Sequence, residues 1–188
     1  MSETIELTCP NPSTVNPLQL SGFSMNINKI PELSFWVQTA NIPSIDLTNT
    51  EQSTPFTNVY QAGDKPNFGD LSITFLVDEN LDNYTALYEW IYLVGFPQNY
   101  TQVQSWKSRW WDKDKFDSNF GLTSDGSITI KTSNARPIRT VYFKDLIINS
   151  LGELLLTSDQ TETQYVTCTA GFKYTYWTME NSTQEAIQ

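Results

Sequence analysis

The sequence predicts a mainly β fold, a β-sandwich or open barrel with one packed α-helix and a long protruding hairpin. Three observations predict it. Apolar and polar residues alternate along several segments, and one segment, residues 80–94, has helical spacing instead. A polar stretch, residues 48–67, is too long for an ordinary connection. At 188 residues the chain is long enough to bury a core as one domain.

The chain begins with a proline-rich segment. Residues 1–20 contain Pro10, Pro12 and Pro17 among Ser, Thr and Asn, a composition that disfavours helices and central strands. Apolar side chains then alternate at positions 23, 25 and 27, and the Pro31-Glu32 turn leads into residues 33–39. We therefore predict an N-terminal arm, residues 1–20, followed by a β-hairpin.

Residues 43–47 continue in extended form into the polar stretch, where Val59-Tyr60 is the only compact apolar pair. Long loops without regular structure are uncommon in compact domains and usually have a function. We interpret the stretch as a protruding hairpin that contacts a neighbouring copy; a mobile surface loop is the alternative. The predicted contact residues here are Pro43, Asp46, Val59 and Tyr60.

Residues 71–77 form the clearest strand, and residues 80–94 form one amphipathic helix that Gly95 and Pro97 end. Asp78, Glu79 and Asp82 stand at the start of this helix. A pair of carboxylates could serve glycosidase-type acid and base chemistry. Their position favours the simpler interpretation, that they cap the helix and complement its dipole.

The C-terminal half predicts strands at residues 127–131, 139–149 and 164–177. A Trp-rich insertion, residues 99–123, interrupts the β domain of residues 21–178, and residues 179–188 form a C-terminal tail. Trp110 and Trp111, with Trp106, are predicted to contact another subunit because Trp is enriched at interface cores. The alternatives are a cluster buried within the subunit and stacking on a sugar or a base, as in a β-sandwich carbohydrate-binding module.

Composition argues against an enzyme. The chain has no His, which excludes Ser-His-Asp and Cys-His nucleophile pairs and His-ligated zinc. Its two cysteines, Cys9 and Cys168, are too few for a Cys-only zinc site, and we expect both to be free thiols. We predict no catalytic residues, no metal and no cofactor.

The net charge of −10 repels phosphate backbones and anionic lipids. No apolar run approaches the length of a bilayer span, so we expect no membrane insertion. One relationship to DNA remains compatible with this charge, in which an acidic surface faces the duplex without binding it.

The order of these features resembles the tail tube proteins of contractile-tailed bacteriophages, which share their fold with the inner tubes of related injection machines. Three stretches carry the resemblance. Residues 23–47 resemble the family's opening hairpin, and residues 62–91 resemble its block of glycine, strand, acidic pair and Trp-bearing helix. Residues 141–148 and 165–177 resemble its closing strands. The arm and the Trp-rich insertion have no counterpart that can be placed.

The resemblance implies a structural virion protein in the phage tail, assembled in the host cytoplasm. Hexameric rings would close their inner strands into one barrel and stack into a tube inside a sheath, with baseplate proteins as further partners and DNA passing through the lumen. Asp46, Glu51 and Asp64 would lie near the lumen or a ring junction. A baseplate tube initiator or a tail terminator ring is the alternative role.

Overall fold

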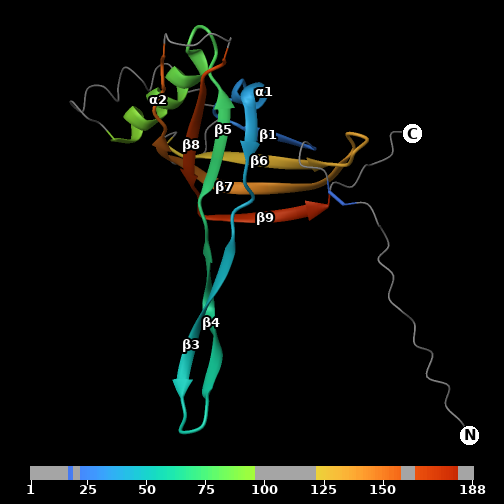
Figure 1. Cartoon of the computed structure of the whole chain (residues 1–188), viewed down its shortest axis with the longest axis vertical. Helices are drawn as coiled ribbons and strands as arrows, with labels where there is room; N and C mark the ends of the chain where they lie inside the picture. Colours follow the sequence, from blue (N-terminus) through green and yellow to red (C-terminus); the bar gives the residue numbers. More distant parts are fainter. Residues whose placement is uncertain (1–16, 19–21, 96–121, 158–163, 182–188) are drawn as a thin grey trace, which may run out of the picture.

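The computed structural model describes residues 17–18, 22–95, 122–157 and 164–181. In these residues, two antiparallel sheets that share one strand form a body, and a two-stranded hairpin extends far from it (Figure 1). The predicted fold class, mainly β with a packed helix and a protruding hairpin, is confirmed. The predicted arm lies outside the described residues apart from Pro17 and Leu18.

Sheet I is the sheet whose strands lie across the body in Figure 1, and all its neighbouring strands are antiparallel. In spatial order it consists of β1 (Phe23–Ile27), β6 (Ser124–Lys131), the first half of β7 (Pro137–Leu151) and β9 (Tyr176–Asn181).

Sheet II crosses sheet I and carries the hairpin. In spatial order it consists of the second half of β7, then β8 (Thr167–Lys173), β5 (Leu71–Leu76) and β2 (Val37–Ala40). The strand predicted at residues 71–77 is therefore confirmed as β5. It lies in the interior of the sheet, and Leu71, Ile73 and Phe75 are completely buried.

A bend in β7 lets this strand belong to both sheets. Asp145 has φ 56°, in the left-handed region that non-glycine residues rarely adopt. Before the bend β7 pairs with β9, and after it with β8, along the same edge. The prediction of one strand over residues 164–177 is therefore wrong, because the chain opposite the bend breaks at Tyr174 and Thr175 into two strands. β9 then continues to Asn181.

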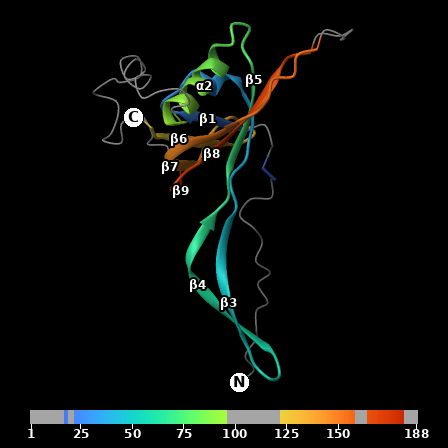
Figure 2. The ribbon, with the colours of Figure 1, turned by 90° about the vertical axis from the view of Figure 1, so that its left-hand side faces the viewer.

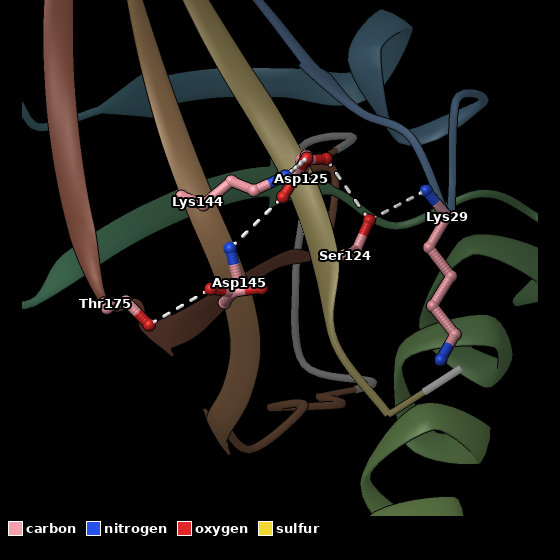
Figure 3. A network of polar contacts seen from close by, with 6 residues as sticks. All are labelled: Lys29, Ser124, Asp125, Lys144, Asp145 and Thr175. Carbon is pink, nitrogen blue, oxygen red and sulfur yellow. Dashed lines mark hydrogen bonds and ion pairs between the residues drawn. The ribbon is translucent and has the colours of Figure 1, made fainter. Parts of the chain in front are cut away.

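Polar contacts hold the bend (Figure 3). The Asp125 carboxylate accepts a hydrogen bond from the backbone N–H of Asp145 at 3.1 Å, and the Nζ of Lys144 lies 2.6 Å from its other oxygen. On the far side, the hydroxyl of Thr175 donates to Asp145 at 3.3 Å. The Asp125 contacts join β6 to β7, and the Thr175 contact joins β7 to the break between β8 and β9, so the bend is held from both sides.

The core lies between the two sheets and is closed by α2 (Asp82–Gly95), which confirms the helix predicted at residues 80–94. Leu87 and Trp90 of α2 are buried against both sheets. Asn83, 5% exposed, ties the helix to β5: its side chain accepts from the N–H of Asp78 and donates to the carbonyl of Leu76. The side-chain contact that ties the start of α2 to the preceding strand therefore comes from the amide of Asn83.

The hairpin predicted over residues 23–39 is wrong. β1 pairs with β6 and β2 pairs with β5, so the two segments belong to different sheets. A short helix, α1 (Leu33–Trp36), separates them, and Ile30 and Leu33 are buried there. The alternation at 23–27 correctly indicated a strand, but it carries no information about the partner strand.

Lys29 is a buried cation, 6% exposed, that follows β1. Its Nζ lies 4.7 Å from the centre of the Trp90 ring, and its backbone N–H donates to the Oγ of Ser124 at 3.1 Å. Burial lowers the pKa of Lys29 from 10.5 to about 8. The aromatic face stabilises the cation in part, since the ring quadrupole attracts positive charge.

The lowered pKa of Lys29 predicts that the free energy of unfolding increases with pH. Below pH about 8 the Lys29 amine is charged in both the folded and the unfolded state, and its burial opposes folding. Between pH about 8 and 10.5 only the unfolded chain keeps the proton, so the free energy of unfolding increases as the pH rises. Between about pH 7 and about pH 9.5 we expect this group to add roughly 2 kcal/mol to the free energy of unfolding. Urea denaturation at both values measures it. Lys29→Met should lack this increment, and an equal increment in both proteins would contradict the assignment.

Candidate assembly surfaces

The hairpin of β3 (Ile45–Ser53) and β4 (Asn58–Phe68) projects from the body in both views (Figures 1 and 2). All of β3 is exposed, and no residue of β4 is buried. Nine strand residues span roughly 30 Å, so the tip lies well beyond the core. An element that has no buried residue in its own chain is available to pack against other molecules, and this makes the hairpin a candidate assembly surface.

A bulge shapes the hairpin. Leu47 lies opposite Pro66 and Asn49 opposite Ala62, so Thr48 alone faces residues 63–65. A Cβ on Gly63 would overlap the backbone carbonyl of Thr48 as well as its hydroxyl. Glycine is therefore required at this close approach of the two strands.

Gly63→Ala is expected to distort the hairpin while leaving the body intact. Overpacking of this kind costs about 1–3 kcal/mol, borne by a segment without core contacts. Hydrogen exchange should accelerate in residues 45–68, while β5 and β8 keep their protection. Gly95→Ala is the matched control, since a Cβ there meets nothing within 4 Å. Unchanged exchange in the hairpin of Gly63→Ala would contradict the bulge.

The predicted contact residues do not all lie at the surface. Asp46, Val59 and Tyr60 are exposed on the hairpin, Tyr60 at 65%. Pro43 is buried at its base, so its side chain contributes to packing within the chain. Trp110 and Trp111 lie outside the described residues.

The three acids predicted near a lumen are all exposed on the hairpin. Asp46 pairs with Asn67 and Glu51 with Tyr60, positions whose side chains alternate to opposite faces of the ribbon. Asp64 lies within the bulge, and Glu51 accepts a hydrogen bond from Asn58. The ladder register therefore places Asp46 and Glu51 on opposite faces of the ribbon.

Sequence reasoning missed a second surface, the two open edges of sheet I. Among the described residues, β1 pairs only with β6 and β9 only with β7, so each has an outer edge without a strand partner. β1 contains no charge and no proline, and β9 contains a single charge, Glu180. Natural monomers protect such edges with charges, prolines or bulges. The uncharged sequence of β1 was the available signal, but it identifies an edge only once the strand order is known.

The direction of the strands makes these edges complementary. Sheet I contains an even number of antiparallel strands, so β1 and β9 run in opposite directions. A rotated copy could therefore place its β1 against β9 in an antiparallel pair, the pairing already used throughout the sheet. The hairpin extends beyond the β9 side of the body in both views (Figures 1 and 2).

The acids considered for catalysis stand on the surface near the start of α2. Glu79 and Asp82 are exposed and Asp78 is half-buried. In the described part of the chain, no group of His, Cys, Asp and Glu side chains is arranged to hold a metal ion. Cys168 is buried and unpaired, and burial raises the pKa of its thiol. No helix within the described residues is long and apolar enough to cross a membrane.

No protein-family model and no curated protein sequence matches the chain. Solved structures do match it. The anti-feeding prophage cap, described as a tube-terminating cap, is 12% identical with a TM-score of 0.62, covering 95% of this chain and 100% of that one. The anti-feeding prophage baseplate, 6-fold symmetrised, gives 13% identity and a TM-score of 0.57, covering 89% and 97%.

A third structure, the sheath-tube complex of an extracellular contractile injection system, is 11% identical with a TM-score of 0.56 and covers 89% of this chain and 93% of that one. At such identities the likeness concerns the fold. All three matches span nearly the whole of the matched chains. The protein therefore has the contractile tail tube-type fold, shared with tube, cap and baseplate proteins of contractile injection systems.

Proposed function

We propose that this protein is a structural subunit of a contractile tail, which assembles with copies of itself into hexameric rings that stack as a tube. The observation that carries the proposal is the pair of open, oppositely directed edges of sheet I. Joining β9 of one copy to β1 of the next removes both edges and closes a continuous barrel. The 6-fold symmetry of the matched baseplate supports the ring order.

The hairpin supplies the second part of the contact. It leaves the body beyond β9, so the neighbour that pairs with β9 would also meet residues 44–66 (Figure 1). Its reach of roughly 30 Å also allows contact with the adjoining ring. Asp46, Val59 and Tyr60 are the proposed contact residues, and Asp46, Glu51 and Asp64 are proposed to face the lumen or a ring junction. Obligate interfaces of this kind commonly bury over about 2,000 Å².

The proposed biological setting is a bacteriophage virion. The tube would form in the host cytoplasm on a baseplate, inside a sheath, and would conduct DNA without specific binding. The role is structural and non-catalytic. The matched structures that include sheath, cap and baseplate support partners of these kinds.

Electron microscopy of the purified protein tests the proposal. Rings or tubes are expected, with the ring order visible in end-on views. Persistence of monomers across protein and salt concentrations would overturn it.

A second role, a ring at the end of the tube, is favoured by a specific observation: the matched structures include a tube-terminating cap and a terminator. Copy number separates the two roles. A tube subunit should be among the most abundant chains of the purified particle, whereas an initiator or terminator should be present as one ring.

A further inference from the structure

One face of sheet I is turned away from the core, and we call it the open face. It consists of positions 24 and 26 of β1, the odd positions 125–131 of β6, the even positions 140–144 of β7 and the even positions 176–180 of β9. The alternate positions of the same strands carry Met25, Ile128 and Phe143, which are buried. Every side chain of the open face is at least partly exposed. Register places these residues opposite one another, and the hydroxyls of Thr129 and Thr140 lie 3.4 Å apart.

The charges on this face cancel. It carries two acids, Asp125 and Glu180, and two bases, Lys131 and Lys144, while its other side chains are Ser, Thr, Asn and Tyr. The net charge of the open face is therefore zero (two positive and two negative charges), on a protein whose net charge is −10. The Nζ of Lys144 is 2.6 Å from the carboxylate of Asp125 (Figure 3).

The proposed ring would turn this face toward the channel. The opposite face of sheet I is covered by sheet II and α2, so it cannot line a lumen. Charges more than about 10 Å from a cargo are screened at about 0.1 M salt. Acids farther away than this therefore act weakly at the wall. Asp145 is nearer, but it stands at the β7 bend and its carboxylate accepts a hydrogen bond from Thr175. The four charges on the face itself are those that a cargo would meet directly.

We propose that the channel wall is charge-balanced and rich in hydroxyl groups, and that Asp125 maintains this balance against the lysines of the open face. Passage of a polyanion such as double-stranded DNA then depends on the absence of attraction at the wall, without requiring an excess of acid there. The inference rests on the proposed function, because it needs sheet I to line a channel.

The charge balance of the open face can be changed by substituting Asp125. Asp125→Asn changes the sum of the open face from zero to plus one in every copy, and a ring repeats this charge around the channel. The asparagine keeps a side-chain oxygen that can accept from the N–H of Asp145, the contact that holds the β7 bend. Asp125→Asn/Lys144→Gln restores the sum to zero and is the matched control.

The test uses tubes assembled with short fluorescent double-stranded DNA at about 0.1 M salt, treated with nuclease and then pelleted. Asp125→Asn tubes should protect at least about tenfold more DNA than wild-type tubes, since each phosphate contact releases counterions, and the excess should disappear as salt is raised. The double variant should return to the wild-type level.

Two results would overturn the inference: equal protection by Asp125→Asn and wild-type tubes of normal appearance, or wild-type tubes that already retain DNA. Both leave the tube proposal standing. If the wild-type protein forms neither rings nor tubes, the proposed function fails and the wall assignment fails with it.

Discussion

Replacing Met179 with proline is expected to abolish ring and tube formation while leaving a folded monomer. Met179 lies in the middle of β9 with 41% of its surface exposed. Proline lacks the backbone N–H and cannot donate to a strand ladder. The expectation depends on which direction this N–H takes.

Alternation of the ladder gives the direction. Asp125 accepts from Asn28 and Lys131 donates to Gly22, so odd positions of β6 bond toward β1 and even positions toward β7. In the β6–β7 register the even positions of β6 lie opposite odd positions of β7, so the even positions of β7 bond toward β9. These lie opposite positions 176, 178 and 180 of β9, whose amides therefore point toward β7. The N–H of Met179 therefore points to the open edge. Proline there removes a donor used only by an added strand.

Size-exclusion chromatography with light scattering and electron microscopy measure the assembly, and circular dichroism measures the fold. Met179→Thr is the matched control, since it changes the same side chain but keeps the N–H, and it should still assemble. If Met179→Pro formed normal tubes, the assignment of β9 to the interface between copies would be wrong.

The second large effect concerns the core. Phe172→Ala is expected to lower the free energy of unfolding by about 3–5 kcal/mol. Phe172 is completely buried on β8, between Leu71 of β5 and Ile148 of β7, and its ring lies 5.9 Å from that of Trp90. Its removal leaves a cavity where sheet II meets α2.

Thermal unfolding should show a decrease in Tm of roughly 10 °C for a chain of this length. Phe56→Ala is the control with the same chemistry, because Phe56 is 98% exposed at the hairpin turn and should change stability by less than about 0.5 kcal/mol. Similar losses in both variants would contradict the assignment of Phe172 to the core.

The candidate surfaces were only partly predictable. A polar, proline-punctuated stretch indicated a protruding hairpin, because such a composition cannot be buried and is too long for a turn. Pro43 was expected at a contact yet packs inside, since proline composition does not reveal which way the ring faces. The open edges of sheet I were not predicted, because an edge is a property of the strand order.

The sequence by itself determined the types of element and the absence of histidine chemistry. Alternation at Leu71, Ile73 and Phe75 and helical spacing at Leu87 and Ile91 are local signals, set by which side chains must leave water. Tertiary structure alone decided that β1 pairs with β6 and that β7 bends at Asp145 to enter both sheets. It also decided that the open face is neutral. The β1–β6 pairing joins residues about a hundred positions apart, and one strand's period cannot specify which distant strand completes its ladder.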